Sequence, residues 1–309
     1  MQKRSKVIAI VGPTSSGKTS LGIWLAKQIQ KEFGGAEIIS ADSRQVYKGL
    51  DIGTGKVTKK EMAGVPHHLL SVASPKKVFS ASDFKKLGEQ AIRLIYQSNH
   101  VPIVVGGTGL YADVLLGRML LPEVSPNKKL RERLERLTTR QLFARLEKAD
   151  PERARNIEPG HKQRIIRALE IAAAIGKSPP KEAAMHASEQ YDVLWLGLDP
   201  GVKQLQKNIH IRLFARIRAG MVAEAKKLHK KGLSYNRMRE LGLEYRFLAD
   251  YLENKVTRPE MERGLESAIN KYAKRQMRWF KRNKDIHWLT DKTEAIRFVK
   301  AFMKKKRAR

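Results

Sequence analysis

Cysteine is absent from this 309-residue chain. Its absence excludes disulfide bridges, zinc sites built on thiolates and catalysis by a cysteine nucleophile. A chain without cysteine also suits a reducing compartment, and we therefore expect a cytoplasmic protein.

Long apolar runs are lacking as well. A membrane-spanning helix needs about 20 consecutive apolar residues, and no run in this chain approaches that length. The run Val7 to Val11 is too short for the apolar part of a signal peptide and ends at a glycine-rich segment. Because the chain also has no lipidation motif and no helical pattern with a strongly apolar face, we expect no contact with a membrane.

Acidic residues are scarce relative to basic ones. The chain has 31 Asp and Glu against 62 Lys and Arg, which gives a formal net charge of +31. Solubility requires far less charge than this, and such an excess of one sign indicates a polyanionic partner. Nucleic acid is the first candidate for that partner.

Segments typical of strands and helices alternate in the first third of the chain. Continuous apolar runs at 7–11 and 101–105 are typical of strands buried on both faces of a parallel sheet, and 38–39 is a shorter run of the same kind. Residues 19–33 and 83–96 repeat apolar side chains at helical spacing. The alternation predicts an α/β fold with an open parallel sheet flanked by helices.

The pattern changes after residue 121. Residues 122–190 are helical in periodicity, highly charged and punctuated by proline, whereas 193–198 is again an apolar, strand-like run. Helical patterns fill the rest of the chain. We therefore predict a catalytic core formed by 1–121 and 191–309, interrupted by a helical insertion domain at 122–190.

A phosphate-binding motif follows the first predicted strand. Residues 12–19 match the pattern GxxxxGK(S/T) and lead into the first predicted helix, which is the context that a P-loop requires. In such a loop the backbone N–H groups and the helix N-terminus bind phosphate, the lysine adds a positive charge and the final hydroxyl can bind Mg²⁺. We predict a diphosphate site in a P-loop NTPase-like core, with Thr19 as the Mg²⁺ ligand. Its residues are Gly12, Pro13, Thr14, Ser15, Ser16, Gly17, Lys18 and Thr19.

Asp42 follows the second predicted strand. A side chain in this place lies at the carboxyl edge of the sheet, where open α/β folds bind their ligands. Three interpretations remain open from the residue and its position alone: a metal ligand, a general base, and a cap of a turn, which Asp followed by Ser often forms.

Six further segments resemble the tRNA dimethylallyltransferase family. The fifteen residues Asp42 to Lys56 carry the most specific likeness, and the other segments occur in the family's order along nearly the whole chain. The resemblance implies a P-loop-type core and a helical insertion that closes around the tRNA anticodon arm. It also implies dimethylallyl diphosphate and Mg²⁺ as ligands, and it favours the bacterial form of the enzyme, because the eukaryotic form carries a cysteine-containing zinc finger. The satellite segments are 66–70, 106–111, 163–170, 205–228 and 272–280.

The family implies roles for individual residues. Asp42 would be the base that faces the adenine amine, Thr108 would line the channel where the two substrates meet, and Arg212 would reach the diphosphate. The predicted protein acts as a monomer. Basic residues of the C-terminal helix, interleaved with aromatics, add a face that can follow phosphates. The predicted tRNA-binding residues are Asp42, Ser43, Arg44, Gln45, Gln163, Arg164, Ile165, Ile166, Arg167, Lys274, Arg275 and Arg278.

The chain departs from the family pattern at three places, which are Gly160-His161, Asn208 and Glu244. Two other enzyme classes share parts of the motif set: small-molecule P-loop kinases, and prenyltransferases that act on free adenine nucleotides. A third alternative is a non-catalytic RNA-binding P-loop protein, which would not need Asp42 or Thr108. The charge and the length of the resemblance favour the tRNA-modifying enzyme.

Overall fold

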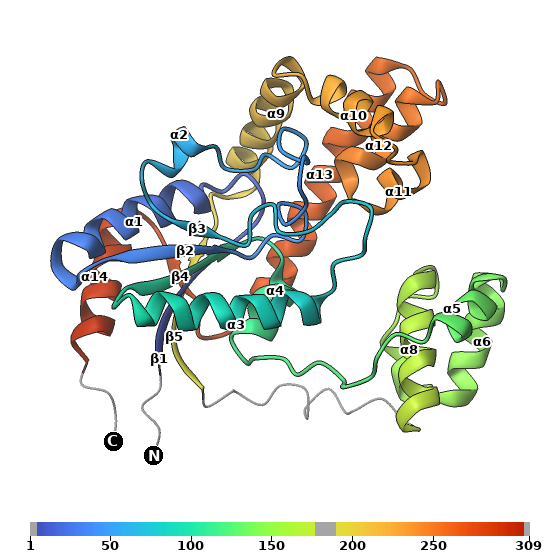
Figure 1. Cartoon of the computed structure of the whole chain (residues 1–309), viewed down its shortest axis with the longest axis horizontal. Coiled ribbons are helices and arrows are strands. Elements are labelled where there is room, and N and C mark those ends of the chain that lie inside the picture. Colours follow the sequence, from blue (N-terminus) through green and yellow to red (C-terminus); the bar gives the residue numbers. More distant parts are fainter. Residues whose placement is uncertain (1–4, 177–189, 306–309) are drawn as a thin grey trace. The chain divides into compact units, whose positions relative to one another are not determined.

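A computed structural model describes residues 5–176 and 190–305 of the chain. Its centre is a six-stranded, all-parallel sheet with the strand order β3-β2-β4-β1-β5-β6 (Figure 1). The predicted open parallel α/β fold is thereby confirmed. The strands are β1 (Ser5–Val11), β2 (Ala36–Ser40), β3 (His67–His68), β4 (Val101–Gly106), β5 (Tyr191–Leu198) and β6 (His287–Leu289).

Helices cover both faces of this sheet because the central strands are apolar on both sides. Along β1, alternate residues enter two separate cores: Ile8 and Ile10 pack with α1 and α14, whereas Val7 and Ala9 pack with α3 and α4. No helix within the described ranges is long and apolar enough to cross a membrane. The sheet-covering helices are α1 (Lys18–Phe33), α3 (Ala81–Gln97), α4 (Gly109–Leu115) and α14 (Lys292–Lys304).

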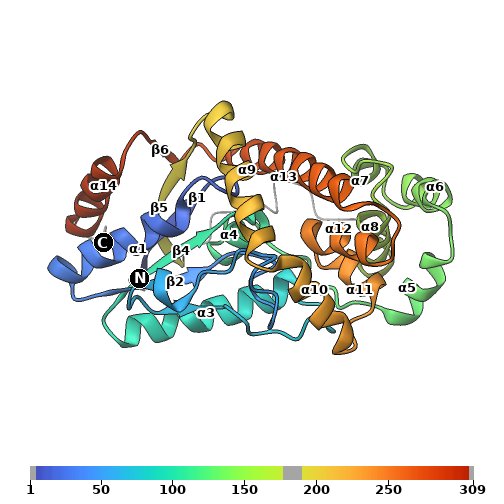
Figure 2. The ribbon, with the colours of Figure 1, turned by 90° about the horizontal axis from the view of Figure 1, so that it is seen from above.

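A second group of helices has its own core next to the carboxyl ends of the strands. The loop after β2 contributes Val46, Tyr47 and Leu50 to that core, so this loop packs against the helices. Figure 2 shows α9 passing over the central strands and α13 extending away from them beside α12. The helices of this group are α9 (Val202–Arg218), α10 (Met221–Lys230), α11 (Tyr235–Glu240), α12 (Leu243–Leu252) and α13 (Arg258–Phe280). A further short helix, α2 (Lys59–Met62), lies in the connection between β2 and β3.

The chain divides into two compact units. One comprises Met1–Gly117 and Ser188–Arg309, and the other comprises Arg118–Ala187. The described part of the second unit is entirely helical, with a small core built on Leu142, Leu146 and Ile165. Its helices are α5 (Lys128–Glu135), α6 (Thr139–Ala149), α7 (Pro151–Arg155) and α8 (Lys162–Ile175).

A buried carboxylate holds the helices of the second unit together. Glu170 is 2% exposed and accepts hydrogen bonds from Arg131 Nε (2.6 Å) and Arg131 Nη2 (2.7 Å), from the Asn127 N–H (2.9 Å) and from Arg167 Nη1 (3.2 Å). Burial raises the pKa of Glu170, but the hydrogen bond from Arg131 and those from Asn127 and Arg167 outweigh it, so the pKa lies below its usual range. The carboxylate therefore stabilises the unit at neutral pH, and this stabilisation is lost as the pH falls through the lowered pKa.

We expect Glu170→Ala to destabilise the helical unit by about 1.5 to 3 kcal/mol, because it removes the buried charged acceptor that Arg131, Arg167 and the Asn127 N–H share. Hydrogen exchange of the α5 and α8 amides in the full chain measures the change. Glu132→Ala, at an exposed position of α5, is the matched control and should leave exchange unchanged. If the α5 and α8 amides were equally protected from exchange in both variants, Glu170 would not be the residue that stabilises the unit.

Candidate active site

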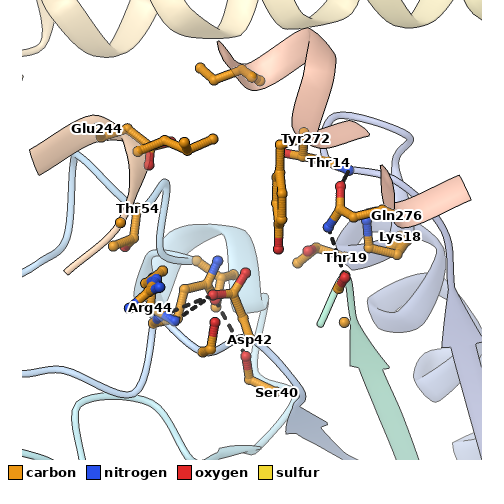
Figure 3. A pocket seen from close by; sticks show the side chains of 18 of the residues that line it. Thr14, Lys18, Thr19, Ser40, Asp42, Arg44, Thr54, Glu244, Tyr272 and Gln276 are labelled. Atoms are coloured by element: carbon orange, nitrogen blue, oxygen red, sulfur yellow. Dashed lines mark hydrogen bonds between the residues drawn. The ribbon is translucent and has the colours of Figure 1, made fainter. Parts of the chain in front are cut away.

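A polar pocket lies at the carboxyl ends of β1, β2 and β4 and is walled by α9, α12 and α13 (Figure 3). All of its lining residues belong to the first unit. The lining combines the P-loop residues Thr14, Lys18 and Thr19 with the segment Asp42 to Gln45. The structure thus brings together two of the segments that the sequence singled out.

The P-loop conformation depends on glycine. Gly12 has φ 145° and Gly17 has φ 91°, and a Cβ on Gly12 would lie 2.6 Å from the carbonyl oxygen of Leu198 in β5. Gly17 is the N-cap of α1, which begins at Lys18 and directs its N-terminus at the loop. The Lys18 ammonium donates to the Pro13 carbonyl across the loop.

Three cationic side chains converge on the pocket from the P-loop and α9. Lys18, Arg212 and Arg216 all line it. Burial, followed by repulsion from Arg212, lowers the pKa of Lys18 from 10.5 to about 7, although Asp42 opposes this shift. Burial and repulsion from Arg216 likewise lower the pKa of Arg212. Positive groups that are desolvated and repel one another form a strong site for an anion, whose binding relieves the repulsion.

The Asp42 carboxylate is held in a fixed orientation. Its Oδ1 accepts the N–H groups of Arg44 (2.8 Å) and Gln45 (3.2 Å), so the turn-capping interpretation is correct for this oxygen. Among the described residues, none donates a hydrogen bond to the other oxygen, Oδ2. One oxygen therefore shapes the loop, and the second remains available to a ligand.

Thr108 contacts residues that line the pocket but does not line it itself. It was expected to line the substrate channel, but it is not among the lining residues. Its hydroxyl instead accepts the Ser43 N–H (3.0 Å) and hydrogen-bonds to Tyr272, and both of these residues do line the pocket. Burial, followed by the nearby Asp42, raises the pKa of Tyr272 to about 12, so this phenol is a neutral donor at physiological pH. Thr108 therefore positions lining residues.

The sequence analysis assigned no role to two side chains that line the pocket, Arg216 and Gln276. Arg216 lies one helical turn after Arg212 on α9, and that i, i+4 spacing was the signal that could have found it. Gln276 on α13 is 6% exposed; its Oε1 accepts the Thr14 N–H (2.8 Å) and its Nε2 donates to the Gly107 carbonyl (2.8 Å). No spacing pattern in the sequence could predict these two hydrogen bonds, because Thr14 and Gly107 are 262 and 169 residues away from Gln276 in the chain.

The departures from the family pattern have structural partners in this chain. Asn208 donates from Nδ2 to the Ser15 carbonyl (3.1 Å) and so supports the P-loop. Glu244 pairs with Arg216 at 3.2 Å inside the pocket. His161 is the residue before α8 and pairs with Glu158 at 2.9 Å.

The predicted tRNA-binding residues fall into exposed and buried sets. Ile165 and Ile166 are 0% and 1% exposed in the core of the helical unit, so predicting their side chains as RNA contacts was wrong. They form the apolar face of α8, which the helical spacing of apolar residues produces. Arg167 is half-buried and donates to the Val124 carbonyl (2.7 Å) and to Glu170. The exposed members are Gln163, Arg164, Lys274, Arg275 and Arg278, and the half-buried ones that line the pocket are Asp42, Ser43, Arg44 and Gln45.

Comparison with known proteins identifies the relatives of this chain. A tRNA dimethylallyltransferase of Halalkalibacterium halodurans is 36% identical over 293 residues, which cover 92% of this chain and 91% of that protein. One from Bacillus velezensis is 37% identical and covers 95% and 93%. The crystal structure of a Bacillus halodurans tRNA isopentenylpyrophosphate transferase superposes with a TM-score of 0.72 at 34% identity, over 98% of each chain.

A more distant structure, of a eukaryotic dimethylallyltransferase acting on tRNA, gives a TM-score of 0.80 at 26% identity and covers 99% of this chain and 82% of that one. The family model described as IPP transferase matches residues 45–283. The match includes Arg212, Arg216 and Gln276 of the pocket. On its sequence and on its fold, this chain belongs to the IPP transferase family.

Proposed function

We propose that this enzyme transfers a dimethylallyl group from dimethylallyl diphosphate to N6 of the adenosine 3′-adjacent to a tRNA anticodon and releases diphosphate. Both relatives described above are named tRNA dimethylallyltransferase, which is an enzyme that prenylates tRNA. The observation that carries the proposal for this chain is the pocket itself, in which Lys18 of the P-loop, the two arginines of α9 and the Asp42 carboxylate line one cavity. A kinase of the P-loop type is not favoured.

The donor half of the reaction needs stabilisation of a leaving group. As the allylic C–O bond breaks, negative charge accumulates on the diphosphate, and preorganised cations lower the barrier most where that charge develops. Lys18, Arg212 and Arg216 are already assembled on the pocket wall. We assign them to the diphosphate, with the P-loop N–H groups and the α1 N-terminus.

Mg²⁺ fits this donor site as an ion whose ligands would come from both the protein and the diphosphate. Among the described residues, no group of three or more His, Asp or Glu side chains could hold a metal by itself. Mg²⁺ in phosphate sites keeps several waters and takes few protein ligands, and the Thr19 hydroxyl on the pocket wall is a suitable one. When bound, the ion would neutralise charge on the diphosphate.

The acceptor half needs an adenine taken out of the anticodon loop, since a base that is modified must be unstacked to be reached. The adenine amine is a poor nucleophile because its lone pair is delocalised into the ring. We assign Asp42 Oδ2 to accept its hydrogen bond and then its proton as the bond to the allylic carbon forms. The exposed Lys274, Arg275 and Arg278 on α13, with Gln163 and Arg164 on the helical unit, are assigned to the RNA backbone. The enzyme would act as a cytoplasmic monomer.

One assay tests the reaction and its alternatives. The protein is incubated with unmodified tRNA and with dimethylallyl diphosphate or ATP, each labelled in the group that would move. Transfer of the prenyl label to tRNA is expected. Transfer of the ATP γ-phosphate to a small molecule would support a kinase, prenyl transfer to free AMP but not to tRNA would support a nucleotide prenyltransferase, and no transfer at all would leave only RNA binding.

The net charge of +31 leads to a prediction for tRNA binding. Each phosphate that the protein neutralises releases counterions and contributes roughly 0.7 to 0.9 to the slope of log affinity against log salt. We expect a slope that corresponds to several contacts, measured by fluorescence anisotropy between low and physiological salt. A slope near zero would contradict the polyanion interpretation.

A further inference from the structure

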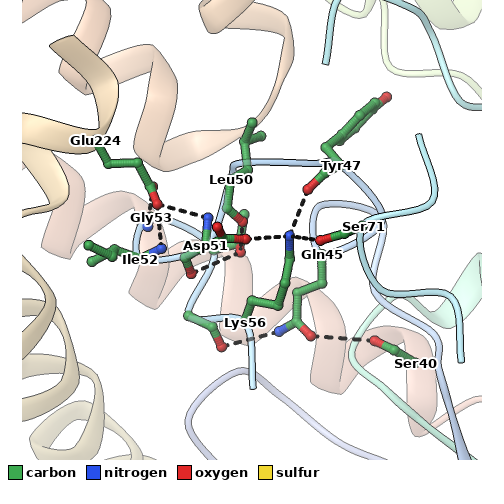
Figure 4. Close-up of polar contacts among 12 residues, drawn as sticks. Ser40, Gln45, Tyr47, Leu50, Asp51, Ile52, Gly53, Lys56, Ser71 and Glu224 are labelled. Atoms are coloured by element: carbon green, nitrogen blue, oxygen red, sulfur yellow. Dashed lines mark hydrogen bonds and ion pairs between the residues drawn. The ribbon is translucent and has the colours of Figure 1, made fainter. Parts of the chain in front are cut away.

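The turn formed by residues 51–55 is bound by a single carboxylate from α10 (Figure 4). Glu224 Oε2 accepts the N–H groups of Asp51 (2.9 Å) and Ile52 (2.7 Å), and Oε1 accepts the Gly53 N–H (2.9 Å). The Tyr245 hydroxyl of α12 donates to the same Oε1 at 2.6 Å. Three consecutive backbone donors and one phenol therefore share this carboxylate, which is a strongly charge-assisted arrangement.

The carbonyl groups of the same turn accept from the two pocket arginines. Arg216 Nη1 donates to the Gly53 carbonyl (2.6 Å), and Arg212 Nη2 donates to the Gly55 carbonyl (3.0 Å). The turn thus presents its N–H groups to Glu224 and its carbonyl oxygens to the guanidinium groups. The N–H and the carbonyl of Gly53 flank one Cα, and the Gly55 N–H donates to the Ile52 carbonyl (3.0 Å), so the carboxylate and the arginines act on one hydrogen-bonded turn.

Close packing leaves this turn little freedom to move without its partners. A Cβ on Gly53 would lie 2.7 Å from the Tyr245 hydroxyl, and one on Gly55, where φ is 59°, would lie 2.5 Å from Arg212 Nη2. At the far end, the buried Lys56 ammonium donates to the Tyr47 carbonyl, to Asp51 Oδ1 and to Ser71 Oγ, each at 2.7 Å. A displacement of the turn would therefore move both arginines together.

We propose that Glu224 is a positioning residue for diphosphate binding: by holding the N–H groups of the 51–53 turn, it sets the places of Arg212 and Arg216 in the donor pocket. The inference rests on the proposed function, since it assigns these arginines to the diphosphate. Glu224 itself is not among the residues that line the pocket, so it acts on the ligand only through the turn.

Replacing Glu224 by glutamine tests the charge and the two acceptor oxygens of the side chain while keeping its size and shape. Glu224→Gln keeps the side-chain length but replaces one acceptor oxygen with an NH₂ group. That group would face either the Asp51 and Ile52 N–H groups or the Gly53 N–H, and in both cases donors meet donors. At least one N–H group of the turn then loses its acceptor, and the turn must shift to find water or another partner.

The test compares Glu224→Gln with Glu32→Gln, which removes the same charge from the exposed end of α1. Binding of inorganic diphosphate, measured by isothermal titration calorimetry, should weaken about tenfold or more in Glu224→Gln, the effect expected when a charged acceptor is lost. Single-turnover prenyl transfer at saturating donor should fall by up to about 10², because catalysis is sensitive to misplacement of about 1 Å. Affinity for tRNA should stay within threefold, and the control should match the wild type throughout.

Unchanged diphosphate affinity in a folded Glu224→Gln variant would overturn this inference and leave the proposed function standing. Failure of the wild-type protein to bind diphosphate would overturn the proposed donor site and the inference with it. If Glu224→Gln does not fold, Tyr245→Phe takes its place, since it removes only the phenol donor to Oε1. Tyr245→Phe should weaken diphosphate binding by a few fold without altering tRNA affinity. If it binds diphosphate as tightly as the wild type, the positioning role of Glu224 is rejected.

Discussion

Replacement of Asp42 by asparagine is expected to lower the single-turnover rate of prenyl transfer by about 10² to 10⁴, the usual effect of losing a positioned acid or base. Asparagine can place its carbonyl oxygen where Oδ1 now accepts the Arg44 and Gln45 N–H groups, so the turn is kept. Its NH₂ group then occupies the place of Oδ2, which can no longer accept a proton. Donor and tRNA affinities should therefore stay within a few fold of the wild type.

The same variant distinguishes the three roles considered for Asp42. If the carboxylate binds Mg²⁺, Asp42→Asn would lose donor affinity and recover with excess metal. If it only caps the turn, turnover would remain within threefold of the wild type, and that result would end the general-base assignment. Thr108→Ala is the companion variant; because Thr108 contacts Ser43 and Tyr272 from outside the pocket lining, we expect a smaller loss.

Replacement of Lys18 by alanine is expected to weaken binding of dimethylallyl diphosphate and to slow transfer by about 10² to 10³, the effect of losing one preorganised donor at a developing charge. Affinity for tRNA should be nearly unchanged, because Lys18 is enclosed beside the P-loop and Arg212. Equilibrium binding of each substrate measures both effects. A collapse of tRNA binding in a folded variant, or unchanged donor affinity, would remove Lys18 from this role.

The lowered pKa of Lys18 adds a pH signature to this variant. The free enzyme loses the ammonium proton as the pH rises through about 7, whereas the bound diphosphate favours the ammonium form and raises this pKa. The contribution of Lys18 to donor affinity is therefore fully present below pH 7 and declines above it, and binding at pH 8 should take up about one proton. Calorimetry in buffers of different ionisation enthalpy detects this uptake, which should be absent in Lys18→Ala.

The periodicity of apolar residues was sufficient to predict the architecture, but it could not predict all the contacts of the candidate site residues. Buried parallel strands such as 101–105 leave continuous apolar runs, and these were recognised; the edge strand β6 (His287–Leu289) has no such run, because it is short and lies at the end of the sheet. Helical spacing also placed Ile165 and Ile166 on α8, but it could not show that their face is the core of the helical unit.

The sequence by itself determined the P-loop, the strand that ends before Asp42 and the excess of positive charge, because each of these is local or additive along the chain. Only the tertiary structure decided which groups meet. Arg212 and Arg216 reach the turn at 53–55 from more than 150 residues away, Gln276 joins the P-loop across 262 residues, and Glu224 holds the turn across more than 170. Such contacts depend on packing between distant helices and leave no periodic trace in the chain, so the geometry of the donor pocket belongs to the fold.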